Sequence, residues 1–295
     1  MTADESRPSS SSSPGPEGPG RGLAAHGPLL IPLEQTWWQR HRRMVWIHGA
    51  RLAVLAALLG IWAALSGNVL DPQFFGSPEG VAKSLIDWSA DGTLWRNSWI
   101  TIQEVVLGFV LGAASGAILA YLIAAIKPLW EVLIPYMLAL YSVPKVAVAP
   151  LFIIWFGIGL SMKVLLAAIS VFFLVFLSTA AGVQNVDEGL KNAVRMMGGS
   201  RRDVALKVTL PASMAGLLTG LRMSIPYALI GAVIGELVAS NRGLGFLISD
   251  SSAQFNTSGV FAALVVLAVI AGVLNMLVNV FDRWANRWKP LDSGD

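Results

Sequence analysis

The sequence predicts an all-α polytopic membrane protein with about six transmembrane helices. Of its 295 residues, 55% are hydrophobic and only 13% are charged, whereas a soluble domain carries about 25% charged residues. The apolar residues fall in runs of about 20, the length that crosses a hydrocarbon core about 30 Å thick. A soluble protein with a large buried helical core is the alternative, and the scarcity of charge disfavours it.

The N-terminal part is predicted to contain a disordered tail and a first anchor. Residues 1–30 are rich in Ser, Pro and Gly and cannot bury enough apolar surface to order. No apolar stretch with a small-residue cleavage site lies near the start, so we expect no secretory signal. Residues 31–70 are interpreted as an interfacial segment followed by a transmembrane helix over 44–66. Three tryptophans are expected to anchor it at the interface: Trp37, Trp38 and Trp46.

An extracytoplasmic segment, residues 71–96, is predicted to follow. Within it, residues 79–90 have amphipathic helical spacing and are expected to lie on the outer interface.

Residues 97–285 are predicted to form a core of five further spans, and residues 286–295 a cytoplasmic tail. Continuous apolar windows place the spans at 97–125, 131–157, 161–183, 212–238 and 259–281. The window 131–157 contains Pro135, Pro144 and Pro150, so it is either one broken span or two half-helices. Between the last two spans, the apolar patch Leu244–Ile248 is too short to cross the membrane and predicts a small extracytoplasmic helix.

The distribution of Lys and Arg predicts the orientation. One side holds Arg40, Arg42, Arg43, Lys127, Lys191, Arg195, Arg201, Arg202, Lys207, Arg283, Arg287 and Lys289, and the other holds Lys83, Arg96, Lys163 and Arg242. Because positive residues accumulate on the cytoplasmic side, we expect both termini and the loop 184–211 in the cytoplasm of a plasma-membrane protein.

The residue types argue against an enzyme. The chain has no Cys, which excludes disulfides, thiolate catalysis and cysteine metal sites. Its histidines, His26, His41 and His48, all precede or begin the first span, so neither a metal site nor a Ser-His-Asp triad is expected within the membrane. We therefore expect no catalytic residue, no metal and no nucleic-acid partner; the basic run before the first span is read as a topology signal.

The loop 184–211, hereafter the coupling loop, carries the strongest functional signal. We expect a helix over 187–197, a turn at Gly198-Gly199-Ser200 and a second helix over 201–209 that ends before Pro211. A glycine in the turn supplies the left-handed conformation that ends a helix, and Pro211 suits the first turn of the next span. The loop is thus predicted to be a rigid helix–turn–helix tied to a membrane helix.

The spacing in this loop resembles the E-A-A-x3-G-x9-I-x-L-P pattern of permease subunits of ATP-binding-cassette (ABC) importers. Ala193, Gly198, Leu210 and Pro211 match it, Val194 and Val208 are conservative, and Asn192 replaces the usual Glu. The segments 144–159 and 235–248 look like the permeases of the nitrate, sulfonate, taurine and bicarbonate importer group. Phe172-Phe173-Leu174 lacks a proline that the resemblance leads us to expect there.

The resemblance implies a type I ABC importer permease fold and a set of partners. These are two ABC ATPase subunits, a second copy of the chain, an extracytoplasmic substrate-binding protein and the lipid bilayer. ATP and Mg are bound by the ATPase subunits, and the chain itself has no G-x-x-x-x-G-K-[ST] phosphate loop. The resemblance assigns contact with the ATPase subunits to Asn192, Ala193, Val194, Gly198, Gly199, Val208, Leu210 and Pro211.

Ionisable residues inside predicted spans are candidates for the translocation pathway, because they are costly there unless paired or hydrated. Lys145 follows Pro144 in the middle of a span and favours an anionic solute, such as a sulfonate, taurine, nitrate or bicarbonate. The alternative is a structural role for Lys145, by snorkelling or by pairing with Glu104 or Glu236. We include both glutamates among the candidates, and expect Arg222 to form an ion pair near the inner interface.

The remaining observations concern the glycines in the span 97–125 and the alternative classes of protein. Gly108, Gly112 and Gly116 recur every four residues and favour close helix packing over a pore lining. A permease for thiamine-pyrimidine precursors remains an alternative within the same architecture. An ion-coupled secondary transporter is the alternative from another class, but no second copy of either half of the chain is visible. An intramembrane enzyme would need a clustered nucleophile, base or metal site.

Overall fold

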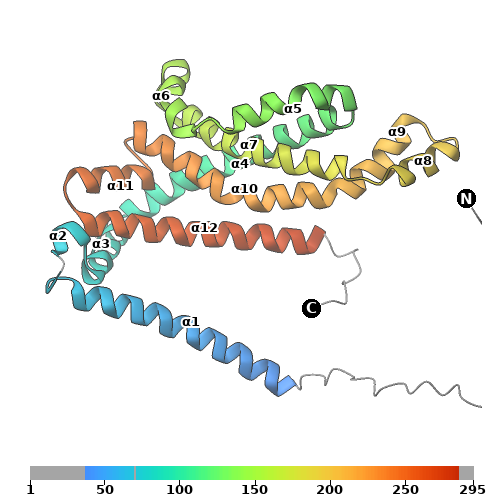
Figure 1. The fold of residues 1–295 in the computed structure, drawn as a ribbon. Coiled ribbons are helices and arrows are strands. Elements are labelled where there is room, and N and C mark those ends of the chain that lie inside the picture. Colours follow the sequence, from blue (N-terminus) through green and yellow to red (C-terminus); the bar gives the residue numbers. More distant parts are fainter. Residues whose placement is uncertain (1–36, 70, 286–295) are drawn as a thin grey trace, which may run out of the picture. The chain divides into compact units, whose positions relative to one another are not determined.

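The computed structural model describes residues 37–69 and 71–285, so both predicted tails, 1–30 and 286–295, lie outside the described residues (Figure 1). The side chains of Trp37 and Trp38 also lie outside the description, whereas Trp46 is exposed. The chain falls into two units, residues 1–54 and residues 55–295. Every regular element in the described part is helical: α1 (Trp37–Leu65), α2 (Pro72–Phe75), α3 (Pro78–Ala90), α4 (Thr93–Ala124), α5 (Lys127–Tyr141), α6 (Lys145–Phe156), α7 (Leu160–Gln184), α8 (Glu188–Met196), α9 (Arg201–Val204), η1 (Ala205–Thr209), α10 (Leu210–Ala239), α11 (Leu244–Ala253) and α12 (Thr257–Ala285).

The predicted spans correspond to five long apolar helices and one bent pair. Among the described residues, α1, α4, α7, α10 and α12 contain stretches long and apolar enough to cross a membrane, and α5 with α6 makes a sixth if the pair counts as one span. The axes of α5 and α6 meet at 91°. Pro144 marks this break, because the residue before a proline is driven out of helical conformation. Pro135 and Pro150 lie inside α5 and α6 and end neither helix.

The centre of the larger unit is α7, which packs against both α4 and α10. The helices approach closely at glycines. A Cβ atom added at Gly112 would collide with the backbone carbonyl of Ala168, and one added at Gly116 would lie 2.6 Å from the Phe172 carbonyl oxygen. The predicted packing role of the Gly108–Gly116 repeat is therefore confirmed.

Short helices join the spans at the end predicted to be extracytoplasmic. The amphipathic helix expected over 79–90 is α3, and the patch expected to form a small helix begins α11. Both α2 and α3 pack against α12. The Thr257 hydroxyl donates to the Gln73 carbonyl (2.6 Å), and the Ser77 N–H donates to the Ser258 hydroxyl (3.4 Å). These bonds tie the segment before α4 to the last span.

Candidate coupling loop and translocation site

The coupling loop contains two short helices joined by a tight turn, as predicted. The Gly189 N–H donates to the Asp187 carboxylate (2.7 Å), which caps the start of α8. Gly198 then adopts a left-handed conformation with φ of 82°. The Gly199 N–H donates to the Val194 carbonyl (2.9 Å), so the turn satisfies carbonyls that the end of α8 leaves open.

The second helix starts at a capping box. The Asp203 N–H donates to the Ser200 hydroxyl (3.2 Å), and the Ser200 N–H donates to the Asp203 carboxylate (2.9 Å). This reciprocal pair satisfies the backbone N–H groups of Ser200 and Asp203, which have no acceptor within the helix. The turn at Gly198 is therefore held from both sides by local hydrogen bonds.

One sequence prediction for the loop is wrong: the helix over 201–209 does not end before Pro211. Instead α9 passes through the π-helical segment η1 into α10 without interruption. The Leu210 N–H donates to the Ala205 carbonyl, five residues back. Pro211 has no N–H, and its ring displaces the carbonyl four residues before it. The wider π turn accommodates that displacement, so the second helix of the coupling loop and α10 form one helical rod.

The loop exposes apolar side chains next to the turn. Met196 and Met197 are 83% and 86% exposed, and Leu190 is also exposed. Around them the charges pair locally, as Lys191 does with Glu188 (3.1 Å). This hydrogen bond from Lys191 lowers the pKa of the Glu188 carboxyl. Adjacent exposed methionines on a charged helix are typical of a docking surface.

The motif positions fall into two groups in the loop. Asn192, Ala193, Val194, Gly198 and Gly199 form the end of α8 and its turn, and Val208, Leu210 and Pro211 form the junction with α10. Asn192, where the motif has Glu, is exposed and accepts a hydrogen bond from the Arg195 guanidinium (2.8 Å). A glutamate there would accept the same bond, which makes the replacement locally conservative.

Lys145 lies at the start of α6, directly after the bend at Pro144. Its ammonium donates to the Tyr141 carbonyl (2.7 Å), which the end of α5 leaves open. It also lies 4.6 Å from the centre of the Tyr141 ring and 5.9 Å from that of Phe173. Lys145 lines a cavity of about 710 Å³ between α4, the α5–α6 pair and α7. Neither Pro144, Glu104 nor Glu236 is among the residues that line it.

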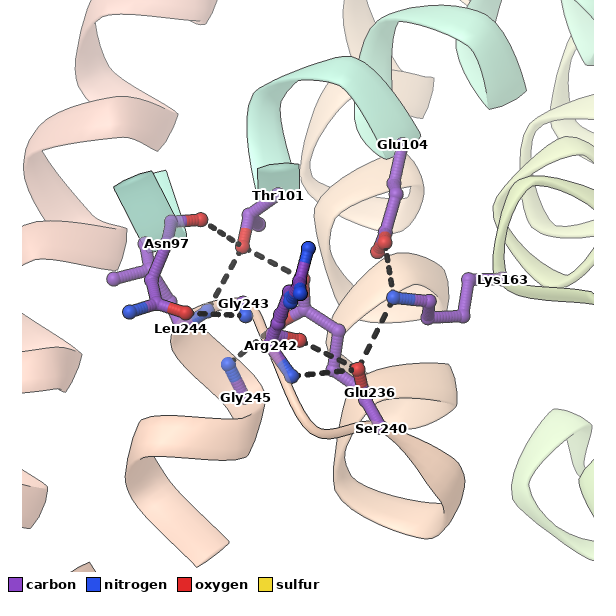
Figure 2. A network of polar contacts seen from close by, with 10 residues as sticks. All are labelled: Asn97, Thr101, Glu104, Lys163, Glu236, Ser240, Arg242, Gly243, Leu244 and Gly245. Atoms are coloured by element: carbon purple, nitrogen blue, oxygen red, sulfur yellow. Dashed lines mark hydrogen bonds and ion pairs between the residues drawn. The ribbon is translucent and has the colours of Figure 1, made fainter. Parts of the chain in front are cut away.

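The two glutamates belong instead to a buried network at the turn between α10 and α11, hereafter the turn network (Figure 2). Glu104 on α4 forms an ion pair with Lys163 on α7. Lys163 also donates to the Ser240 hydroxyl (3.1 Å). Glu104 is fully buried and Glu236 is 1% exposed. The pairing of Lys145 with Glu104 that the sequence left open is therefore not formed.

The other half of the turn network holds the backbone of the turn. The Thr101 hydroxyl donates to Glu236 (2.7 Å) and accepts from the Leu244 N–H (2.9 Å). The Gly245 N–H donates to the second oxygen of Glu236 (2.6 Å), and the Gly243 N–H donates to the Asn97 side chain (2.7 Å; Figure 2). The network thus fixes the start of α11 on α4 and α10.

Sequence reasoning missed Asn97, Thr101 and Lys163 as members of a site. Lys163 was counted only as a charge on the outer side. A signal was nevertheless present: Asn97, Thr101 and Glu104 are spaced four and three residues apart, which places three polar side chains on one face of an apolar helix. No group of His, Cys, Asp and Glu in the described part of the chain could hold a metal ion.

Comparison with known proteins gives a consistent result. The model of the family "Binding-protein-dependent transport system inner membrane component" matches residues 108–289. The putative aliphatic sulfonates transport permease SsuC of Bacillus subtilis is 31% identical over 84% of this chain and 90% of its own length. The taurine permease TauC of Escherichia coli is 29% identical over 80% of this chain and 88% of its own length. The formylaminopyrimidine permease ThiX of Halalkalibacterium halodurans is 26% identical over 78% of this chain and 93% of its own length.

Solved structures agree on the fold. The MetNI methionine ABC transporter, in an inward-facing crystal form, contains a chain that superposes with a TM-score of 0.54 at 20% identity. The match covers 67% of this chain and 96% of the other. At this identity the likeness supports the fold alone, and the fold is that of type I importer permeases, as expected.

Proposed function

The chain belongs to the binding-protein-dependent transport system inner membrane components and is an ABC importer permease of the sulfonate and taurine group; on that premise we propose how it assembles and works. Two copies form the channel, one ATPase subunit binds the coupling loop of each, and an extracytoplasmic binding protein delivers the solute. ATP and Mg are held by the ATPase subunits. Both termini and the coupling loop lie in the cytoplasm, which the Lys and Arg distribution supports.

The observation that carries this proposal is the continuous rod from the coupling loop to α10. The exposed Met196 and Met197 provide a docking surface at the end of α8, and after the turn at Gly198 the elements α9, η1 and α10 follow as one helix. When ATP closes the ATPase pair, the two loops approach each other, and each displaces its α10. The permease then opens outward to receive the solute.

Co-purification with the ATPase subunit tests the proposal. Gly198→Val forces a β-branched residue into a left-handed conformation, so the turn changes shape and we expect at least a tenfold loss of associated ATPase. Gly272→Val on α12, where an added Cβ meets nothing within 4 Å, is the matched control and should retain the ATPase. Equal recovery from both variants, or transport by vesicles of the chain alone without ATP, would contradict the proposal.

We further propose that the solute is a small anion that passes Lys145. Its ammonium in an otherwise apolar cavity supports this assignment. Lys145→Met is expected to reduce uptake at least tenfold while the complex still assembles with its ATPase subunit. Uptake close to that of the unmodified protein would exclude Lys145 from the pathway.

A thiamine-pyrimidine precursor is the second candidate solute. The similarity to ThiX supports it, as do the Phe172 and Phe173 rings along the cavity, because aromatic rings stack on a pyrimidine. Competition decides between the two: formylaminopyrimidine in excess should leave uptake of an alkanesulfonate unchanged if the solute is an anion.

A further inference from the structure

Phe255, in the turn between α11 and α12, combines an unfavourable backbone conformation with an exposed aromatic ring. Among the described residues it is the one non-glycine residue with a positive φ, 56°, and it is 71% exposed. A bulky residue is an outlier in this left-handed region, because its Cβ comes too close to the following carbonyl oxygen. An observed outlier of this kind points to a function that the side chain itself performs.

The turn requires a left-handed residue at this position, but it does not require a phenylalanine. The Asn256 N–H donates to the Ser251 carbonyl (2.8 Å), and the Phe255 N–H donates to the Ser252 carbonyl (3.1 Å). These two bonds form the motif that commonly ends a helix, in which Gly or Asn usually takes the left-handed position. The Gly259 N–H then donates to the Asn256 side chain (3.0 Å) at the start of α12. The backbone of the turn is therefore fixed from both sides, and Gly or Asn would fit it with less strain.

The turn lies beside α2, and we call α2 and residues 254–256 together the rim. The Thr257 hydroxyl donates to the Gln73 carbonyl (2.6 Å), which joins the two parts of the rim. Phe74 and Phe75 on α2 are 66% and 51% exposed. In Figure 1 the rim lies at the end of the helix bundle opposite α8 and α9. Three exposed aromatic side chains thus lie on two fixed elements at the end far from the coupling loop.

The charges beside the rim are acidic. Asp71, directly before α2, and Asp250, on α11, are both exposed, and the rim itself contains no Lys, Arg, Trp or Tyr. Segments that lie on a membrane surface carry Lys and Arg beside their apolar residues, and Trp and Tyr are the residues enriched at the interface. The composition of the rim therefore favours a protein partner over the lipid surface.

We propose that the rim is a docking surface for the extracytoplasmic substrate-binding protein, with the Phe255 ring as its anchor in an apolar pocket of that partner that basic side chains surround. This inference rests on the proposed function and identifies where its second soluble partner binds. An aromatic side chain on a fixed backbone loses little conformational freedom on binding, which suits a residue that dominates an interface. Asp71 and Asp250 then face the basic groups and set the orientation of the partner.

Docking of the purified binding protein to the full complex of permease and ATPase subunits in lipid nanodiscs tests the anchor. Phe255→Asn removes the ring and suits the left-handed conformation. We expect it to weaken docking at least tenfold and to raise the midpoint of thermal unfolding by about 2 °C, because the strain is relieved. Phe255→Tyr keeps an aromatic ring and should change docking less than threefold.

The opposite signs of these two effects separate recognition from a structural role. A purely structural residue would lose stability and docking together, so a lower midpoint for Phe255→Asn would contradict the proposal. Unchanged docking of Phe255→Asn would also overturn it, and the ring would then be assigned to the lipid.

The acidic groups are tested by a double variant, Asp71→Asn with Asp250→Asn. Each Asn can still accept the hydrogen bond that the Asp accepts now, from the Gln73 N–H (2.9 Å) and from the Gln254 side chain (2.8 Å). We expect docking at least fivefold weaker at low salt and a smaller loss of affinity as salt is added. Glu131→Gln, on the exposed start of α5, is the matched control and should change neither. The same salt dependence in the double variant and the unmodified complex would refute a basic partner surface.

The unmodified complex distinguishes this inference from the proposed function. If no binding protein docks to it or stimulates its ATP hydrolysis, the proposed function fails first. If the binding protein docks equally to the unmodified complex and to Phe255→Asn, the rim is not the docking surface and the importer assignment stands.

Discussion

The turn network and the coupling loop are both rich in polar contacts. The two regions differ in how far apart in the sequence the contacting residues lie. Four side-chain hydrogen bonds of the turn network link residues 77 to 146 positions apart, and the bond from Gly245 to Glu236 links residues nine positions apart. Those within residues 187–203 of the coupling loop link residues two or three positions apart. The first region is buried, and the second is exposed.

This difference separates a region that belongs to the helix bundle from the region proposed to dock the ATPase subunit. The contacts that join α4, α7 and α10 in the turn network form only when these helices are packed together, so they belong to the tertiary structure of the bundle. Residues 187–203 of the coupling loop instead make their side-chain hydrogen bonds within that segment. This segment can therefore keep its shape while its apolar side chains stay exposed. We propose that those side chains become buried only when the ATPase subunit binds.

The largest effect on stability is expected from a substitution that breaks the ion pair of the turn network. Lys163→Met leaves the buried Glu104 carboxylate without its lysine, and removing one partner of a buried pair costs about 3–5 kcal/mol. Lys207→Met in the coupling loop breaks an exposed pair with Asp203 (2.6 Å), and exposed pairs contribute about 0–1 kcal/mol. Denaturant unfolding in detergent micelles measures both free energies.

A double variant controls for the loss of the lysine side chain itself. Lys163→Met combined with Glu104→Gln removes the pair without leaving a charge, so most of the lost stability should return. Equal free energies of unfolding for Lys163→Met and Lys207→Met would refute the contrast between the two regions.

A smaller effect is expected where the backbones of α4 and α7 touch. Gly112→Ala places a methyl group against the Ala168 carbonyl, and overpacking of this kind costs about 1–3 kcal/mol. Gly272→Ala, with nothing within 4 Å of the added Cβ, should instead stabilise α12 by about 0.5–1 kcal/mol. Thermal unfolding followed by circular dichroism gives the sign of each change; a neutral Gly112→Ala would mean that α4 and α7 can separate without cost.

The smallest effect should stay inside the coupling loop. Ser200→Ala removes the N-cap of α9, a loss of about 1 kcal/mol, whereas Ser200→Gly should cost only a few tenths. Because the loop is locally organised, we expect faster amide hydrogen exchange at residues 201–204 and no shift in global unfolding. A shift in the global midpoint would show that the loop is coupled energetically to the bundle.

Much of the fold was predictable because it depends on local patterns. The length and polarity of each apolar run located the spans, and Gly198 with its neighbours located the turn of the coupling loop. The boundary at Pro211 was not predictable in the same way. A proline normally ends a helix, and only the shift to i→i+5 hydrogen bonding in η1 allowed the rod to continue.

In the candidate site, too, the features set by local sequence were predictable and those set by helix packing were not. The motif residues of the coupling loop lie together because they are close in sequence. Lys145 was recognised from its charge in an apolar run, but its cavity depends on the 91° bend between α5 and α6. Lys163 received no role, because its partner Glu104 lies on another helix.

The sequence by itself determined which segments enter the membrane, where the coupling loop lies and which family the chain resembles. Hydrophobic length and motif spacing are properties of consecutive residues, and they need no knowledge of neighbouring helices. Only the tertiary structure decided that Glu104 pairs with Lys163 and that Lys145 faces a cavity without a carboxylate. Those outcomes depend on how far each helix is rotated and how closely it approaches the next, and at α4 and α7 that approach is set by glycines meeting backbone carbonyls.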